Sequence, residues 1–314
     1  MEERCIEGLG HLPDVVRGCV LTVGNFDGVH LGHQRILAAA RSLADAEGLA
    51  AVAMTFDPPP DLVLRPRDPP QRITPALQKA RLLLKSGADY AVTARAAPAL
   101  LSMSPGQFVD EILVSHFAPR HMVEGNDFYY GRRRAGNIKM LRQAGAEHGF
   151  AVHVTDSVIC DVGDGPVHVS STLIRRLLLA GRVEQAADCL GRPFELFGSV
   201  IRGLGRGRQL GCPTANLDAG QQVVPADGVY VGMATVGGRD FPAAVSIGDQ
   251  PTFPDGYRAV EALLLDAGGE YYDEQMALRF VRRLRDQVPF PSVEALRTQI
   301  NKDVQSVREI VSGE

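Results

Sequence analysis

The chain has 314 residues, which exceeds most single hydrophobic cores and suits two domains of ordinary size. Hydrophobic residues make up 45% and charged residues 22%, as in soluble globular proteins, and the net charge of −4 excludes the overall basic surface typical of nucleic-acid-binding proteins. The five cysteines include no C-x-x-C pair, so they predict neither a zinc ribbon nor a disulfide framework. The N-terminal residues lack the apolar core of a signal peptide, and no segment reaches the ~20 apolar residues that cross a bilayer. We therefore expect a cytoplasmic protein with no membrane or nucleic-acid partner.

The first half alternates apolar runs with amphipathic segments. Residues 19–23 and 49–56 predict buried strands, and residues 34–47 between them carry apolar side chains on one helical face. Strands that alternate with helices predict a doubly wound parallel sheet. The proline-rich residues 58–60 and 65–72 should form a loop between these units. The alternation continues with helices expected at 75–86, 104–117 and 137–148, and strands at 88–93, 120–124 and 150–155.

After about residue 190 the pattern changes to strand-like runs without helices between them, which predicts a compact antiparallel barrel or sandwich. A helix at 183–190 should lead into this part. A last helix, from the N-cap Ser292 to about residue 311, has one apolar face and should lie across the barrel. We place the domain boundary between residues 187 and 188, which gives domains of residues 1–187 and 188–314. The strand-like runs are 195–201, 228–236, 241–247, 259–266 and 276–284.

The stretch GNFDGVHLGHQ (24–34) lies between the first strand and the first helix, at the sheet edge where open α/β folds bind ligands. Its histidines, His30 and His33, are packing residues, zinc ligands or phosphate ligands. Zinc would need further ligands, and the sequence shows no cluster of Cys or His that could supply them. The glycine-rich turn favours phosphate, because helix N–H groups attract anions and imidazoles donate hydrogen bonds to phosphate oxygens.

A second motif, VSSTLIRRLLLAG (169–181), places Ser170, Ser171 and Thr172 at the head of a short helix, with Arg175 one turn further on. Hydroxyl groups at a helix head often serve only as N-caps. Together with helix N–H groups and an arginine they also form a polyphosphate site. Both interpretations remain open on this motif alone.

The most specific passage of the second half is GSVIRGLGRGRQLGCPTANL (198–217). Its glycines and arginines suit a solvated turn, an RNA contact or a phosphate-binding loop. In PTAN (213–216), Thr214 and Asn216 point to the same side of an extended segment, and their oxygens suit a Mg²⁺ ion that also binds ATP phosphates.

HLGH and SSTLIR together resemble the hallmark motifs of the H-x-G-H nucleotidyltransferase superfamily. With EGNDFYYGRRRAG (124–136), the first half is similar to the FMN adenylyltransferase module of bacterial bifunctional FAD synthetases. The second half resembles the riboflavin kinase module that this family places C-terminally, through the passage above and through PADGVYVG, IGDQPTF, VEALLLD and PFPSVEALRTQINKDV. The resemblance implies a Rossmann-like nucleotidyltransferase domain followed by a Greek-key β-barrel with a C-terminal helix.

The resemblance also implies two reactions, in which ATP and Mg²⁺ convert riboflavin to FMN and ATP converts FMN to FAD and pyrophosphate. Glu261 would be the base of the kinase, His30 and His33 would contact the triphosphate in adenylyl transfer, and Thr214 and Asn216 would hold Mg²⁺. The partners are then riboflavin, FMN and ATP, and we expect a monomer or weak homo-oligomer. The other nucleotide-binding residues implied are Gly24, Asn25, Phe26, Asp27, Gly28, Asp127, Ser171, Thr172, Arg175, Gly203, Arg206, Gly207, Arg208, Gly211 and Pro213.

The sequence departs from the family pattern in both halves. FDPPP (56–60) has Pro59 where the family has a histidine, which removes a phosphate donor. In VSIGDQPTF (245–253) the family's Asn, Thr and Arg are replaced, and a further position where His is common is Leu. The replacing residues are Ser246, Asp249, Gln250 and Leu263.

Three alternatives therefore accompany the bifunctional enzyme. In the first, one half of the chain has lost its activity. In the second, the protein binds flavin without catalysis and acts as a regulator. In the third, RRR (132–134) and RGLGRGR (202–208) bind nucleic acid, which the net charge disfavours.

Overall fold

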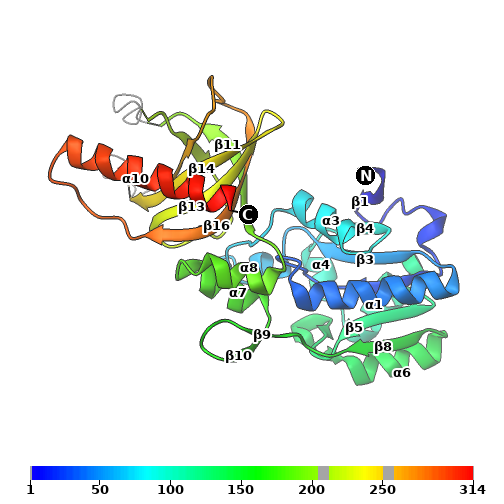
Figure 1. The fold of residues 1–314 in the computed structure, drawn as a ribbon. Helices are drawn as coiled ribbons and strands as arrows, with labels where there is room; N and C mark the ends of the chain where they lie inside the picture. Colours follow the sequence, from blue (N-terminus) through cyan, green and yellow to red (C-terminus); the bar gives the residue numbers. More distant parts are fainter. Residues whose placement is uncertain (1, 204–211, 250–257, 314) are drawn as a thin grey trace. The chain divides into compact units, whose positions relative to one another are not determined.

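The computed structural model describes residues 2–203, 212–249 and 258–313 (Figure 1). The chain forms two compact units: Met1–Pro70 with Thr74–Ser171, and Gln71–Ile73 with Thr172–Glu314. The proline-rich segment expected as a loop is partly helical, since α2 (Pro60–Leu64) begins within it. Its end joins the second unit, where Gln222 Nε2 donates a hydrogen bond to the carbonyl of Ile73 (3.2 Å). No helix among the described residues is long and apolar enough to cross a membrane.

The first unit is built on a six-stranded sheet in the order β1-β4-β3-β2-β5-β8, and every strand pair is parallel. The predicted parallel sheet is therefore confirmed. The sequence missed the edge strand β1, because three residues give no readable periodicity. The strands are β1 (Cys5–Glu7), β2 (Val20–Val23), β3 (Ala51–Phe56), β4 (Tyr90–Ala94), β5 (His121–Gly125) and β8 (Ala151–Thr155).

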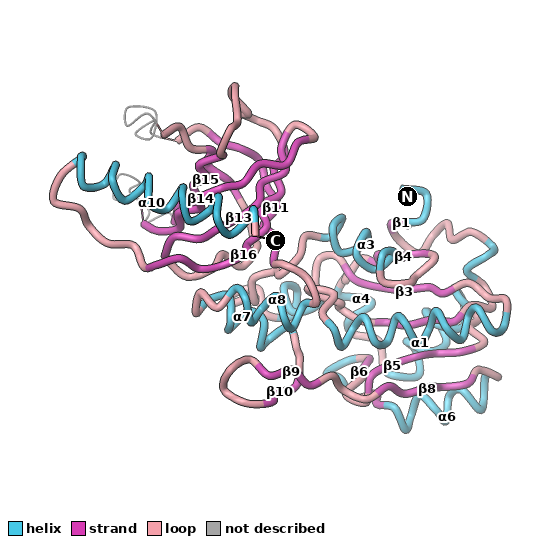
Figure 2. Tube along the Cα trace, in the orientation of Figure 1, coloured by secondary structure: helices cyan, strands magenta, loops and turns pink. Residues whose placement is uncertain are grey.

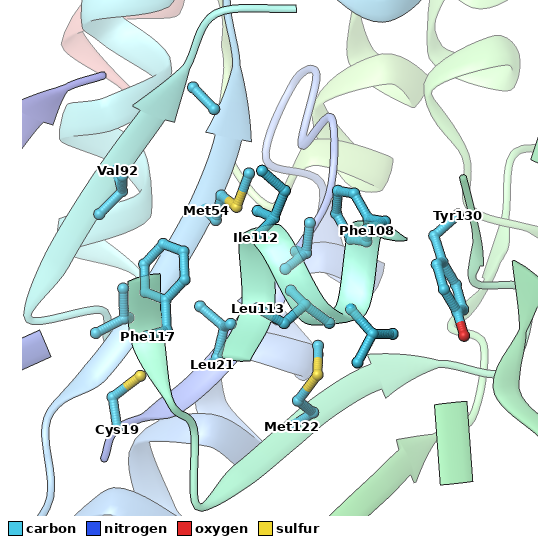
Figure 3. Close-up of a cluster of buried hydrophobic side chains, with 14 of the residues drawn as sticks. Cys19, Leu21, Met54, Val92, Phe108, Ile112, Leu113, Phe117, Met122 and Tyr130 are labelled. Carbon is cyan, nitrogen blue, oxygen red and sulfur yellow. The ribbon is translucent and has the colours of Figure 1, made fainter. Parts of the chain in front are cut away.

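Helices cover both faces of this sheet (Figure 2). The helices α1 (Leu31–Glu47) and α3 (Ala76–Lys85) pack on one face, through residues such as Leu37 and Leu83. The π-helical segment η3 (Phe108–Phe117) contributes to the core on the other face (Figure 3). The helix α6 (Ile138–His148) adds Leu141 to the same cluster. Alternate strand residues face opposite sides, so both sides of the sheet are apolar and both need cover.

Two boundaries in this unit differ from expectation. The helix α1 begins at Leu31, three residues earlier than the expected start at residue 34, so His30 is its N-cap residue and His33 lies in its first turn. The helix expected at 104–117 is a short α5 (Pro105–Gln107), capped by Ser104, followed by η3.

Smaller elements complete the unit. These are α4 (Pro98–Leu101), the strand pair β6 (Tyr129–Tyr130) and β7 (Gly136–Asn137), the pair β9 (Ile159–Asp161) and β10 (Pro166–His168), and the 3-10 turns η1 (Glu2–Arg4), η2 (Asp14–Val16) and η4 (Arg132–Arg134). They are too short for hydrophobic periodicity to predict.

The second unit is a closed antiparallel barrel in the order β11-β12-β15-β14-β13-β16, preceded by two helices. The barrel alternative is thus confirmed over the sandwich. The expected strands are present, and PTAN contributes to one that the run lengths did not predict, β12. The elements are α7 (Ser171–Leu179), α8 (Val183–Leu190), β11 (Phe194–Ile201), β12 (Ala215–Asp218), β13 (Gly228–Val236), β14 (Arg239–Asp249), β15 (Arg258–Leu264), β16 (Gln275–Arg285) and α10 (Val293–Ser312).

The C-terminal helix α10 lies across the barrel as expected (Figure 1). Its Val307 is fully buried against Val231 and Ala244 on the barrel surface. A nearly buried ion pair joins the same elements, because Arg285 Nη2 lies 2.7 Å from Asp303 Oδ2. Apolar contact and charge pairing thus fix the helix to β14 and β16.

Candidate functional site

The turn from β2 to α1 has a constrained backbone. Phe26 and Val29 adopt left-handed conformations with φ of 49° and 40°, beside Gly28 at 85°. A β-branched residue such as valine rarely adopts this region, because its Cβ crowds the backbone. Both side chains are buried, which holds the turn in this shape. Such strain is concentrated at functional sites in proteins.

His30 and His33 lie together at the start of α1. Their rings stack with centroids 3.6 Å apart and an interplanar angle of 21°, and Phe26 meets the ring of His33 edge-on at 5.1 Å. A Cβ on Gly32 would lie 3.1 Å from the ring of His30, and a Cβ on Gly24 would lie 3.1 Å from the ring of Phe26. Two glycines of the motif therefore leave the space that this arrangement of rings needs.

Asp27 of GNFDGVHLGHQ and Ser171 of the second motif are in contact, although they lie far apart in the sequence. The hydroxyl of Ser171 donates a hydrogen bond to the carbonyl of Asp27 (2.8 Å). The buried carboxylate of Asp27 accepts a hydrogen bond from the backbone N–H of Thr74 (3.2 Å). Among the described residues, no group of three or more His, Cys, Asp or Glu is arranged to hold a metal ion.

Asp127 follows β5, the strand next to β2, so it lies at the same carboxyl edge of the sheet as the histidine turn. Its Oδ1 would be 3.0 Å from a Cβ placed on Gly125. A role of Asp127 in nucleotide binding stays a prediction from the sequence.

Glu124 lies on β5, and the sequence analysis predicted no role for it. Its carboxyl group is buried and accepts a hydrogen bond from the N–H of Val23 (2.8 Å), directly before Gly24. Burial raises the pKa of Glu124 well above its usual range, and the hydrogen bond from Val23 opposes this only in part. The signal available in the sequence was a glutamate within an apolar strand.

The remaining residues of the second motif belong to the second unit. Thr172 follows Ser171 in the first turn of α7. The guanidinium of Arg175 donates from Nε to the carbonyl of Gln71 (2.7 Å). Arg175 is therefore oriented by the end of the proline-rich segment.

In the barrel, a row of polar residues crosses three neighbouring strands. Glu261 on β15 pairs with Asn216 on β12 and with Ser246 on β14. Directly paired residues in antiparallel strands point to the same face, so the three side chains lie side by side. Thr214 lies two positions before Asn216 in the extended segment, with the exposed Pro213 before it.

The side-chain amide of Asn216 lies against Gly203. A Cβ on Gly203 would lie 2.3 Å from Nδ2 of Asn216, closer than any stable contact. Gly203 therefore leaves room for the amide. The residues Arg206, Gly207, Arg208 and Gly211, also expected to bind nucleotide, lie outside the described residues.

The departures in the kinase motif have local consequences. The amide of Gln287 donates a hydrogen bond to Ser246 Oγ (2.8 Å), and a Cβ on Gly248 would collide with this side chain. Leu263 packs in the apolar cluster beneath α10, which accounts for an apolar residue there. Asp249 ends β14, and Gln250 lies outside the described part of the chain.

Comparisons with known proteins also divide the chain into an N-terminal and a C-terminal part. Residues 12–173 match the family model described as FAD synthetase, and residues 190–311 match the one described as riboflavin kinase. A bifunctional riboflavin kinase/FMN adenylyltransferase of Pseudomonas fluorescens is 38% identical over 308 residues, covering 98% of this chain and 97% of the relative. The Escherichia coli protein of that name is 33% identical, with coverage of 98% and 96%.

A solved structure from Streptococcus pneumoniae, named as a macrolide-efflux protein, has a TM-score of 0.86 and 28% identity, covering 97% of this chain and 99% of that one. The similarity thus extends over both units, each with the fold that the sequence predicted. The chain belongs to the bifunctional riboflavin kinase/FMN adenylyltransferase family.

Proposed function

We propose that this protein phosphorylates riboflavin to FMN and adenylylates FMN to FAD, with ATP as co-substrate of both reactions. The observation that carries this conclusion is that the FAD synthetase and riboflavin kinase models match consecutive parts of one chain, residues 12–173 and 190–311. We assign the two activities to domains of residues 1–187 and 188–314.

In the kinase reaction, the 5′-hydroxyl oxygen of riboflavin attacks the γ-phosphorus of ATP. A bond forms between these atoms, the bond from the γ-phosphorus to the bridging oxygen breaks, and ADP leaves with the electron pair. Glu261 accepts the hydroxyl proton as general base. Its place between Asn216 and Ser246 in the polar row supports this role.

Thr214 and Asn216 are the proposed Mg²⁺ ligands of the kinase. Their neutral oxygens suit a hard cation that arrives with ATP, and the space left by Gly203 beside the Asn216 amide fits this assignment. When bound, Mg²⁺ would neutralise charge on the phosphates. Backbone and side-chain groups of the loop, including Gly203, Arg206, Gly207, Arg208, Gly211 and Pro213, are proposed to hold the nucleotide.

In adenylyl transfer, a phosphate oxygen of FMN attacks the α-phosphorus of ATP. The bond from the α-phosphorus to the bridging oxygen breaks, and pyrophosphate leaves with the electron pair. No covalent intermediate forms with the enzyme, so positioning and charge stabilisation carry the catalysis. His30 and His33 contact the triphosphate by donating hydrogen bonds.

Further residues hold the substrates of adenylyl transfer. Ser171, Thr172 and Arg175 bind the β- and γ-phosphates, and Asp127 lies near the nucleotide and flavin. The hydrogen bond from Ser171 to Asp27 supports a joint role of both motifs. The turn of residues 24–28, comprising Gly24, Asn25, Phe26, Asp27 and Gly28, brings backbone close to the nucleotide. We propose a cytoplasmic monomer or weak homo-oligomer whose partners are riboflavin, FMN and ATP.

Product analysis with riboflavin or FMN, ATP and Mg²⁺ tests the proposal. The variant His30→Ala should still form FMN from riboflavin and lose FAD formation. The variant Glu261→Ala should form no FMN from riboflavin and still form FAD when FMN is supplied. Wild-type protein that forms neither product would refute the proposal.

A single-activity enzyme is the second candidate, because Pro59, the N-cap residue of α2, offers no imidazole donor. FMN that accumulates without FAD would show this. FAD formed from FMN but not from riboflavin would instead place the defect in the kinase. Tight flavin binding without turnover of ATP would indicate a regulatory protein.

A further inference from the structure

The buried lysine Lys79 lies on α3 and contacts the turn that precedes the two histidines. Only 3% of its surface is exposed. Its ammonium group donates hydrogen bonds to the carbonyl of Asn25 (3.0 Å) and to the carbonyl of Phe56 (2.9 Å). One side chain from α3 thus joins the ends of two neighbouring strands of the sheet.

The two carbonyls belong to the segments that form the carboxyl edge of the sheet here. Asn25 lies in GNFDG (24–28), after β2, and Phe56 is the last residue of β3 and the first of FDPPP (56–60). The carbonyl of Asn25 also accepts a hydrogen bond from the hydroxyl of Thr55 (3.1 Å). Lys79 and β3 therefore fix the backbone one residue before the strained Phe26.

Burying an ammonium group is costly, and its charge remains only where hydrogen bonds offset the lost hydration. An apolar residue in this place would satisfy the packing of α3 against the sheet without that cost. Neither GNFDG nor FDPPP contains a lysine or an arginine, and each contains one aspartate, so Lys79 supplies a basic side chain in contact with both loops. A buried charge acts on nearby anions through a medium of low polarity, where it is screened less than a surface charge.

We propose that Lys79 is a positioning residue for adenylyl transfer, which ties the loop after β2 to the loop after β3 and favours the anionic transition state at this edge of the sheet. This inference rests on the proposed FMN adenylylation. Lys79 acts through the backbone of Asn25 and Phe56, which sets the histidine turn where the triphosphate binds.

The test compares two substitutions that differ in what they retain. Lys79→Met keeps the length and the packing but loses both the hydrogen bonds and the charge. Lys79→Gln keeps a donor but loses the charge. Lys85→Met, on the exposed end of the same helix, is the matched control. For each protein, kcat and KM for ATP are measured in FAD formation from FMN, and FMN formation from riboflavin is measured in the same preparation.

We expect Lys79→Met to lower kcat of FAD formation about 100-fold, as misplaced catalytic groups do, with a much smaller change of KM. The loss in Lys79→Gln should be smaller but clear, and Lys85→Met should match wild type. FMN formation should be unchanged in all three. In Lys79→Ala, propylammonium chloride should restore part of the FAD formation, whereas sodium chloride at equal ionic strength should not.

A merely structural role predicts a different result. Thermal unfolding would then shift, but the folded fraction of each variant would keep the wild-type kcat and amines would restore no turnover. If Lys79→Met fails to fold, a wild-type kcat in Lys79→Gln still overturns the inference. Wild-type protein that makes no FAD would refute the proposed function itself, which separates the two failures.

Discussion

Ser171 donates a hydrogen bond from its hydroxyl to the carbonyl of Asp27, although the two residues lie 144 positions apart in the chain. Asp27 lies in the turn that ends at the stacked histidines, and Ser171 is the first residue of α7. One hydrogen bond within the first unit therefore links Ser171 to the turn that carries the histidine motif. The motif resemblance predicts a common role for these segments, which substitution of Ser171 can test.

Ser171→Ala removes this hydrogen bond and tests the link. The net contribution of one such bond is ~1 kcal/mol, so we expect FAD formation from FMN to fall about fivefold. FMN formation from riboflavin should not change, since the proposed kinase site lies in the barrel. Ser42→Ala, on the exposed face of α1, is the control and should retain both activities. An equal loss of both activities in Ser171→Ala would contradict the prediction.

Gly203→Ala tests the space beside Asn216. The added Cβ would lie 2.3 Å from Nδ2 of Asn216, so the amide must move and the proposed Mg²⁺ ligand is displaced. We expect FMN formation to fall about 100-fold, while FAD formation from supplied FMN persists. Gly268→Ala is the matched control, because its Cβ would meet nothing within 4 Å. Kinase rates equal to wild type in Gly203→Ala would show that Asn216 does not need its present position.

Glu124→Gln tests the buried carboxyl group by its effect on stability. Because burial raises the pKa of Glu124, the folded protein keeps a proton that the unfolded chain loses above the usual carboxyl range. The folded state then binds more protons, so the free energy of unfolding falls as the pH rises toward the raised pKa. Glutamine does not ionise, and it keeps an oxygen for the N–H of Val23.

Urea unfolding between about pH 5 and pH 9 measures this effect. As the pH rises, the free energy of unfolding of Glu124→Gln should increase relative to that of wild type. The exposed Glu111→Gln, on η3, is the control and should follow wild type. If the curves of Glu124→Gln and wild type run parallel, Glu124 does not hold its proton in the folded state.

Asp303→Asn tests how α10 is attached to the barrel. Asp303 is nearly buried and pairs with Arg285, and Gln299 donates a hydrogen bond to the same carboxylate (2.8 Å). Removing its charge leaves the guanidinium of Arg285 without its carboxylate partner, which should lower the free energy of unfolding by about 3 kcal/mol. Asp266→Asn removes the exposed partner of Arg308 on the same helix and should have a much smaller effect, because solvent screens that pair. Equal losses in the two variants would argue against the role of burial.

The sequence predicted the long elements because each carries its own periodicity. The strands around Leu21 and Met54, the helix α1 and the helix α10 all appear close to their expected bounds. The short strand β1 and the helix α2 were not predicted from the sequence, since a few residues carry too little pattern. The start of α1 was predicted three residues too late. A helix start is recognised in a sequence by a typical N-cap residue, and the N-cap here is His30, which makes no side-chain cap hydrogen bond.

The amino-acid sequence by itself determined the order of the two folds, the motifs with His30 and Asn216, and the departure at Pro59. These follow from local patterns and from residue types at fixed spacing. Only the tertiary structure decided that Ser171 meets Asp27, that Glu261 lies between Asn216 and Ser246, and that Lys79 joins Asn25 to Phe56. The reason is that strand order and register bring together residues far apart in the chain, and no periodicity within a segment records which distant segment it will contact.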